Sequence, residues 1–336
     1  MSPHPERRQL LARLTHLAAL TALPSLAAVA GTAAAQGAAW PSRPVRLVVP
    51  YPPGGATDIL ARLVAARLQE AWGQTVTVEN KPGASGLLGN DFVAKAAPDG
   101  HTVLLAITAI VQSASLFPKL PYDPYKDLAP VSLQSTSTSL LVVPAKLPAR
   151  NLAEFVALVK AQPGKHGYGS YGNGTSAHIQ GALLANQAAL DMAHVPYKGA
   201  APMMNDLLGG QLTAAFSDVG TARAHLLSGA VRALAVTGTE RLKLAPDAPT
   251  FGDLGYKHFE PKGWFGFFLP AGTPPAIVAK LSTDIQRAVR LPEITARIEE
   301  LGQVPVGSTP EAFNAVIRND GPLYAKLIRD LNIKLE

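Results

Sequence analysis

The chain has 336 residues, a formal net charge of +6 and no cysteine. The lack of cysteine excludes disulfides, thiol catalysis, cysteine metal sites and a lipid-modified N-terminal cysteine. Lysine and arginine are scattered singly, so the basic balance does not indicate a nucleic-acid partner. A chain of this length corresponds to about two domains and can bury a core without covalent cross-links.

The first 35 residues have the three parts of a secretory signal peptide. Arg7 and Arg8 form a basic start, residues 14–42 contain no Asp, Glu, Lys or Arg, and residues 33–35 (AAA) form a small-residue cleavage pattern. The uncharged run is long enough to cross a bilayer, but its proline, glycine and alanine content favours a cleaved leader. We expect export to the periplasm with a mature N-terminus near Gln36, by the Sec or the twin-arginine route.

The first half of the mature chain alternates β-branched runs with amphipathic segments. We expect strands over residues 45–49, 75–79 and 102–107, and helices over residues 58–72 and 87–97. Thr57 is the expected N-cap of the first helix, and Gly73 follows its end. This alternation predicts an α/β fold with a mostly parallel sheet that is covered on both faces.

The second half repeats the pattern. The expected strands are residues 140–143, 167–171, 194–197, 212–217, 231–236 and 264–269, and the expected helices are residues 151–160, 175–188, 202–208, 274–290 and 310–331. The aromatic run over residues 264–269 (WFGFFL) is interpreted as a strand that returns to the first domain.

Two glycine-rich loops each lie between a strand end and a helix start, over residues 52–58 (PPGGATD) and 170–176 (SYGNGTS). Ligands of α/β sheets bind at the carboxyl ends of strands. A helix start offers an anion free N–H groups and the positive end of the helix dipole. One such loop alone is an ordinary tight turn, but two of them, one in each expected domain, predict a shared anion-binding cleft. Neither loop contains Lys or Arg, so backbone N–H groups would supply most of the neutralisation.

Two charged residues beside these loops have open interpretations. Asp58 either stabilises the first turn of its helix through the dipole, or hydrogen-bonds across the cleft or to an N–H group of a ligand. Lys198 follows the strand over residues 194–197, and a solvated lysine is the common outcome at such a position. We expect Lys198 to be peripheral to the cleft.

A dinucleotide site is not favoured by the pattern around the second loop. Residues 167–172 spell G-x-G-x-x-G, but the strand before them is weak. Asp191 lies before the next strand, whereas an acid that binds a ribose belongs at the end of that strand.

A serine hydrolase is not favoured either. Ser170 resembles a nucleophile elbow with His178 or His194 as its base, but Tyr168 stands where that motif needs glycine, and no acid is placed to orient either histidine. The histidines show no metal-ligand spacing. We expect no enzymatic activity, no cofactor and no metal.

Six stretches of the chain follow the order of one receptor family. They are residues 48–68 (VVPYPPGGATDILARLVAARL), 78–105, 168–184 (YGSYGNGTSAHIQGALL), 194–212, 232–256 and 263–274. With them the chain closely resembles the Bug-type periplasmic solute-binding receptors of tripartite tricarboxylate transporters, over nearly the whole mature sequence.

The resemblance implies an α/β fold of the two-lobed periplasmic-binding-protein type (type II, Venus-flytrap), with two strands crossing between the lobes. We expect a signal peptide over residues 1–35, one lobe from residues 41–138 and 265–336, and the other from residues 139–264. The C-terminal helix packs on either lobe in this scheme. The lobes would close on a small carboxylated ligand, such as a di- or tricarboxylate, an amino acid or an aromatic acid.

The resemblance also implies the residues that contact the ligand. From the first lobe these are Gly54, Gly55, Thr57 and Asp58, together with Ser85 of the glycine-rich loop over residues 81–86 and, less strongly, Thr108 and Ala109. From the second lobe they are Ser170, Gly174, Thr175, Ser176 and His178, and less strongly Ser217 and Asp218. Tyr171 is bulky where this loop is expected to carry a small residue, so the size of the cavity stays open.

The expected function is that of a monomeric receptor that delivers its ligand to a membrane transporter. A sensory receptor of the same fold that docks on a membrane sensor kinase is the alternative, and a periplasmic hydrolase using Ser170 is the least favoured interpretation. The identity of the ligand does not transfer from the family.

Overall fold

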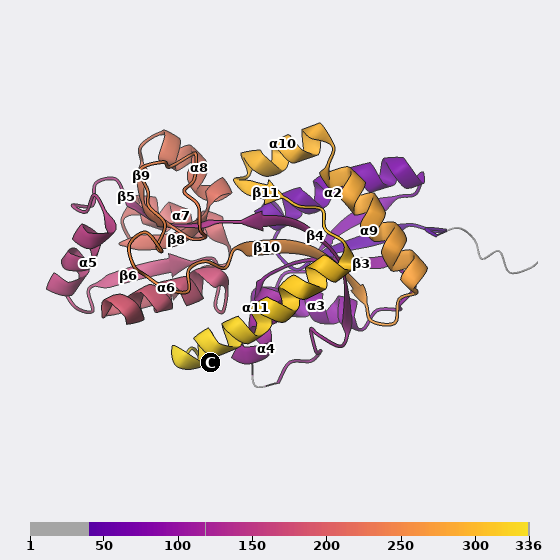
Figure 1. Cartoon of the computed structure of the whole chain (residues 1–336), viewed down its shortest axis with the longest axis horizontal. Helices are drawn as coiled ribbons and strands as arrows, with labels where there is room; N and C mark the ends of the chain where they lie inside the picture. Colours follow the sequence, from indigo (N-terminus) through magenta and orange to yellow (C-terminus); the bar gives the residue numbers. More distant parts are fainter. Residues whose placement is uncertain (1–39, 118, 335–336) are drawn as a thin grey trace, which may run out of the picture. The chain divides into compact units, whose positions relative to one another are not determined.

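The computed structural model describes residues 40–117 and 119–334 (Figure 1). The expected signal peptide therefore lies outside the described residues. All the elements below belong to one compact unit that begins at Arg43. None of the helices in the described ranges is both long and apolar enough to cross a membrane.

The first of two sheets has six strands in the order β11-β4-β10-β3-β1-β2 (Figure 1). These are β1 (Val45–Val49), β2 (Val76–Asn80), β3 (Thr102–Ile107), β4 (Leu128–Ser137), β10 (Gly263–Pro270) and β11 (Gln303–Pro305). Strand β1 pairs in parallel with β2 and β3, whereas β10 runs antiparallel to β3 and β4. The helices that accompany the first sheet are α2 (Ala56–Trp72), η1 (Ala84–Gly86), α3 (Leu87–Ala94), α4 (Ala109–Leu116), α9 (Pro275–Val289), α10 (Pro292–Glu300) and α11 (Pro310–Asp330).

The second sheet has five strands in the order β7-β6-β8-β5-β9. They are β5 (Ser139–Pro144), β6 (His166–Ser170), β7 (Met192–Pro196), β8 (Ala214–Asp218) and β9 (Val231–Val236). Its helices are α5 (Leu152–Ala161), α6 (Ser176–Ala188), α7 (Ala200–Gly209) and α8 (Val219–Leu227). Strands β6, β7 and β8 are parallel, and β5 is antiparallel to β8 and β9.

The chain crosses between the sheets twice. Strand β4 ends at Ser137 in the first sheet and β5 begins at Ser139 in the second, and after β9 the chain returns through β10. In Figure 1, β4 and β10 lie side by side on the path that joins the two sheets. Strands β1 to β4 run in one direction in the first sheet, where β10 and β11 oppose them, and β6 to β9 run in one direction in the second, where β5 opposes them. Both sheets are therefore mixed, but most of their strands are parallel, as the sequence predicted.

Aromatic side chains fix β10 against α11. The Trp264 and Phe313 rings meet edge to face with centroids 5.2 Å apart, and Phe268 lies 5.0 Å from Phe313. The buried Trp264 Nε1–H donates to a carboxylate oxygen of Asp320 on α11 at 2.9 Å. Helix α11 contacts both α4 and α6, so the C-terminal helix packs on elements beside both sheets.

Helix boundaries follow local capping, with one shift that matters for the site. The Asn151 side chain accepts from the Glu154 N–H at 2.9 Å, as expected for the cap of α5. Helix α2, however, begins at Ala56 after an extended Gly55, so the prediction that Thr57 is the N-cap was wrong. The carboxylate of Asp58 accepts from the Gly54 N–H at 3.0 Å, and this bond starts the first turn earlier than a Thr57 cap would.

Candidate functional site

The loop between β1 and α2 is organised by Asp58. This buried carboxylate accepts from the Gly54 N–H and from Arg62 Nε on one oxygen and from Asn80 Nδ2 on the other, each at 3.0 Å. Burial alone would raise the pKa of Asp58, but the hydrogen bonds from Arg62, Gly54 and Asn80 hold it below its usual value, so the group is ionised. Asp58 thus has partners within its own loop and neighbouring elements, which agrees with the local interpretation of the residue.

The same loop presents donors without acceptors. Residues 52–55 are exposed, and Gly54 has a φ of +84°, which glycine adopts without strain. The first helical bond runs from the Ile59 N–H to the Gly55 carbonyl at 3.0 Å. Among the described residues no acceptor takes the N–H groups of residues 55–58. The α2 start therefore combines free N–H groups with the positive end of a 17-residue helix.

The loop between β6 and α6 is held by its own polar side chains. The Thr175 hydroxyl donates to the Gly172 carbonyl at 2.7 Å, and Ser170 Oγ donates to the same carbonyl at 3.0 Å. Ser170 Oγ also lies 2.7 Å from His194 Nε2. Thr175 is the N-cap of α6 by position, but its side chain makes no cap hydrogen bond. Ser170 and Thr175 therefore shape the loop from within.

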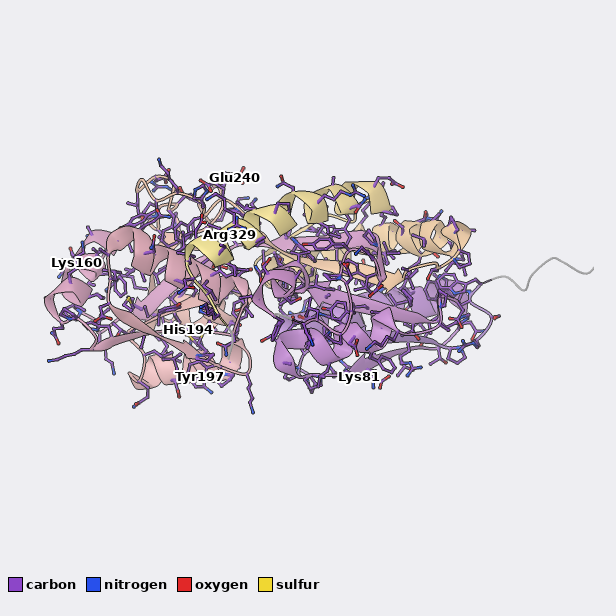
Figure 2. The ribbon with its side chains drawn as sticks, turned by 90° about the horizontal axis from the view of Figure 1, so that it is seen from below. Lys81, Lys160, His194, Tyr197, Glu240 and Arg329 are labelled. Atoms are coloured by element: carbon purple, nitrogen blue, oxygen red, sulfur yellow. The ribbon has the colours of Figure 1, made fainter. Side chains whose placement is uncertain are left out.

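Two stacked histidines lie behind this loop. The rings of His178 on α6 and His194 on β7 have centroids 3.7 Å apart and an interplanar angle of 7°; Figure 2 shows His194 near Tyr197 beside the second sheet. The Gly174 N–H donates to Nδ1 of His178 at 3.1 Å, so that nitrogen carries no proton. Burial lowers the pKa of His178 to about 4, and burial together with His178 lowers the pKa of His194 to about 3. Both rings are neutral at pH 7.

Two hydrogen bonds join the surroundings of the two loops. Ser85 Oγ on η1 donates to the Asn173 carbonyl at 2.8 Å. Gln112 Nε2 on α4 donates to Ser176 Oγ on α6 at 2.9 Å. The predicted residues Ser85 and Ser176 thus contact elements of the opposite sheet directly. Gln112 was not predicted, because only its position five residues beyond the end of β3 could have drawn attention to it.

A cluster of tyrosines surrounds the Gln112–Ser176 pair. The Tyr171 side chain lies near Ser176 and the start of α6. Tyr324 on α11 lies near Ser176 and Gln112. Burial raises the pKa of Tyr171, Tyr324 and the nearby Tyr51, so their hydroxyls stay protonated at neutral pH.

The more weakly predicted residues contact elements other than the two glycine-rich loops. Thr108 Oγ1 accepts from the Trp264 N–H at 2.8 Å and so ties the end of β3 to β10. Asp218 caps α8 by accepting from the Thr221 N–H and hydroxyl, both at 2.8 Å. The Ser217 hydroxyl donates to the Asp218 carbonyl at 3.1 Å, and Ala109 is the buried first residue of α4. These contacts leave Thr108 and Asp218 with structural partners.

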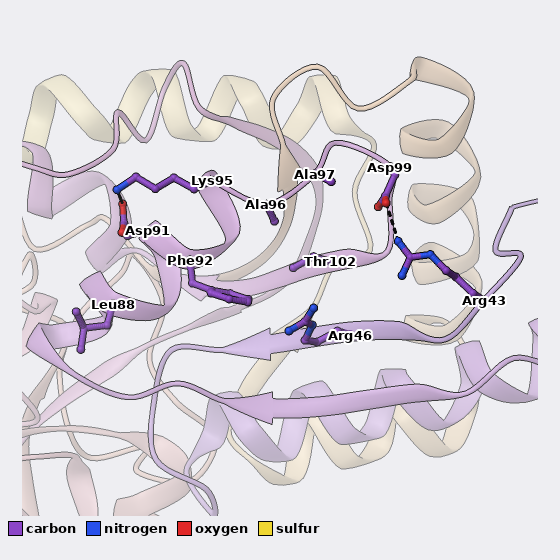
Figure 3. A pocket seen from close by; sticks show the side chains of 10 residues that line it. All are labelled: Arg43, Arg46, Leu88, Asp91, Phe92, Lys95, Ala96, Ala97, Asp99 and Thr102. Carbon is purple, nitrogen blue, oxygen red and sulfur yellow. Dashed lines mark hydrogen bonds and ion pairs between the residues drawn. The ribbon is translucent and has the colours of Figure 1, made fainter.

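Two surface cavities lie away from all of these residues. The first, of about 610 Å³, is lined by α3, β1, β3 and the turns beside them (Figure 3). Its charges are paired, as Arg43 with Asp99 at 2.7 Å and Lys95 with Asp91 at 2.6 Å. The second, of about 350 Å³, lies between α6, α11 and residues 257–258. No predicted site residue lines either one, so neither supports the predicted cleft.

The described ranges, 40–117 and 119–334, contain no group of three or more His, Cys, Asp or Glu side chains arranged to hold a metal ion. The polar groups assembled near the two loops include backbone N–H groups, hydroxyls and side-chain amides. This set suits a hydrogen-bonded organic anion.

Residues 60–333 match the family described as "Tripartite tricarboxylate transporter family receptor". The chain belongs to this family. It is similar to the solved periplasmic binding protein BugD, at 35% identity, over 88% of this chain and 100% of that one, with a TM-score of 0.81. These findings confirm the Bug-type resemblance and the two-lobed α/β fold.

Two solved relatives carry ligands. Rpa4515 from R. palustris, with adipate, is 32% identical over 88% of this chain and 100% of its own, with a TM-score of 0.83. MatC from Rhodopseudomonas palustris, with bound malate, is 32% identical over 86% of this chain and 100% of its own, with a TM-score of 0.80. Adipate and malate are both small dicarboxylates.

Proposed function

We propose that the chain is a periplasmic receptor that binds a small carboxylate between two lobes and delivers it to a membrane transporter. The observation that carries the proposal is the α2 start, where the N–H groups of residues 55–58 have no acceptor in the described structure and the one acid of the loop is saturated by its own partners. A carboxylate oxygen is a strong acceptor for such groups.

The lobes of the proposal are residues 41–138 with 265–336, and residues 139–264. The bonds Ser85–Asn173 and Gln112–Ser176 cross between them and would form as the lobes close. A ligand held by α2 on one lobe and by α6 and its neighbours on the other shifts the equilibrium toward the closed form, which the membrane partner recognises.

The relatives support the chemistry and the compartment. BugD is a periplasmic binding protein, and Rpa4515 and MatC hold adipate and malate. We extend these properties to this chain, with export by a signal peptide cleaved near Gln36. N-terminal sequencing of the periplasmic protein tests the export step, and an intact Met1 in a cytoplasmic pool would contradict it.

The hydrolase interpretation has one favourable contact, the 2.7 Å approach of Ser170 Oγ to His194 Nε2. Ser170 is fully buried, and a histidine whose pKa is about 3 is a poor general base at neutral pH. In the described part of the chain neither stacked histidine donates to a carboxylate that would orient it. We therefore do not propose an enzymatic function.

A thermal-shift screen tests the receptor function. Adipate, malate, amino acids and aromatic acids are compared with their methyl esters, which lack the carboxylate charge. At a free concentration 100 times its Kd, a carboxylate that binds should stabilise the folded protein by about 2.7 kcal/mol, whereas its ester should not stabilise it. The proposal fails if no carboxylate shifts the melting temperature, or if the esters act equally. Co-purification with transporter membrane subunits, as opposed to a sensor kinase, separates transport from sensing.

A further inference from the structure

We propose that Arg62 decides whether the α2 start attracts or repels a carboxylate, because it neutralises Asp58 beside the N–H groups of residues 55–58. Arg62 is then a positioning residue of the binding site, which acts through Asp58 without contacting the ligand. This inference rests on the proposed receptor function and names a residue on which the charge of its binding site depends.

The Arg62–Asp58 pair has a fixed, two-point geometry. Arg62 Nε donates to one oxygen of Asp58 at 3.0 Å, and Arg62 Nη2 lies 2.9 Å from the other oxygen. Arg62 Nη2 also donates to Asn80 Oδ1 at 3.2 Å. A bidentate arginine–carboxylate pair is stronger and more specific in its geometry than a single contact. These three contacts therefore hold the guanidinium at Asp58 although 52% of the Arg62 side chain is exposed.

The backbone of the loop is held by hydrogen bonds that do not need a charge on Asp58. Asn80 Nδ2, at the end of β2, donates to the Tyr51 carbonyl and to Asp58 Oδ1, both at 3.0 Å. The Gly54 N–H donates to the other Asp58 oxygen at 3.0 Å. An amide oxygen at position 58 could accept either of these bonds equally well. The loop geometry and the charge of Asp58 can therefore be tested separately.

The sum of charges at the α2 start changes sign with Arg62. A helix start carries about half a positive elementary charge. Asp58 adds a full negative charge, and because this residue is only 4% exposed, water screens that charge poorly. The helix start and Asp58 together thus carry about half a negative charge, which would repel a carboxylate. The positive charge of Arg62 brings the sum to about half a positive charge, which attracts one.

The neighbouring cations are engaged elsewhere. Within the described ranges, Arg62 is the one Lys, Arg or His at salt-bridge distance from Asp58. On β2, Glu79 lies 2.7 Å from Lys81 Nζ and 3.4 Å from Arg46 Nη1. These three residues form a charge group of their own, so the loss of Arg62 would leave Asp58 without a cationic partner.

Isothermal titration of the mature protein with adipate, and with malate in parallel, tests the proposal. Arg62→Gln should weaken binding at least tenfold, since two unit charges about 6 Å apart at an effective dielectric constant of about 40 change an equilibrium constant about tenfold. The matched control is Arg67→Gln, which removes the same charge from the same helix, where Arg67 pairs with Glu70 at 2.8 Å. It should change the affinity less than twofold. Equal effects of the two variants overturn the proposal.

A double variant separates the charge of Arg62 from its hydrogen bonds. Asp58→Asn combined with Arg62→Gln removes both charges and should restore the affinity to within threefold of wild type, although it breaks more hydrogen bonds than Arg62→Gln alone. A double variant as weak as Arg62→Gln would show a purely structural role and overturn the proposal.

The single variant Asp58→Asn keeps the test decisive if Arg62→Gln does not fold. It leaves the Arg62 charge unopposed and should bind at least as tightly as wild type, whereas a tenfold loss overturns the proposal. A wild-type protein that binds no carboxylate of the thermal-shift screen overturns the receptor function itself. A carboxylate that binds wild type and Arg62→Gln equally overturns the role of Arg62 alone.

Discussion

Replacing Ser176 by alanine should weaken ligand binding through Gln112. The substitution removes the acceptor, 2.9 Å away, of the Gln112 Nε2 group. Gln112 is 0% exposed and its Oε1 already lacks a partner, so water cannot readily replace the lost bond. Leaving a buried polar group unpaired costs about 1–3 kcal/mol. Because the Gln112–Ser176 hydrogen bond joins the two proposed lobes, its loss should make closure of the lobes less favourable by this amount. The affinity for the ligand should therefore fall by about 5- to 150-fold.

Isothermal titration with the best carboxylate from the screen measures this loss. Ser115→Ala, at an exposed position on the same helix as Gln112, is the matched control and should change the affinity less than twofold. Gln112→Met completes a double-mutant cycle with Ser176→Ala, and a coupling free energy of about 1 kcal/mol or more is expected. Effects that add within about 0.5 kcal/mol would show that the two side chains act independently and would refute the reasoning.

Two further predictions concern stability. The native pKa values of His178 and His194, about 4 and about 3, lie below the unfolded value of about 6.5, so the unfolded state binds more protons as the pH falls below 6.5. The free energy of unfolding should thus fall by about 2–4 kcal/mol between pH 7.5 and 5, and a flat melting temperature over this range would contradict it. Gly181→Ala on α6 would place a Cβ 1.9 Å from Tyr168 Cε2 and should destabilise the fold by about 1–3 kcal/mol in urea unfolding. Gly209→Ala on α7 meets no atom within 4 Å and should be neutral or stabilising; equal effects of the two would argue against the packing described.

The strands rich in β-branched residues could be predicted from the sequence, and β4 could not. The run VRLVV of β1 reads as a buried strand in any context. Strand β4 (LAPVSLQSTS) reads as a polar loop, yet Ser132, Gln134 and Ser135 are fully buried in it. Their partners, such as the Ser308 carbonyl and the Gln303 side chain, lie about 170 residues away in the chain. Local pattern carries no information about such partners.

Some features of the candidate site could likewise be predicted from the local sequence, and others could not. The two glycine-rich loops were found because each joins a strand to a helix, which is a local property. The choice between the two interpretations of Asp58 depended on Asn80, which reaches it from β2. Gln112 was missed because no pattern in the neighbouring sequence predicts its contact with Ser176.

Titration of two Gly55 variants with the best carboxylate tests the central claim most directly. Gly55 has a φ of −80° and room for a Cβ, whose nearest neighbour would be the Pro52 carbonyl at 3.8 Å, so alanine and proline both fit its backbone. Proline alone removes the N–H group. The account predicts that Gly55→Ala binds within about fivefold of wild type and that Gly55→Pro, folded by circular dichroism, loses binding. Lys198→Gln, the charge control on an exposed lysine, should have little effect. If Gly55→Pro still binds and Lys198→Gln does not, a side-chain cation and not the backbone of the α2 start holds the ligand.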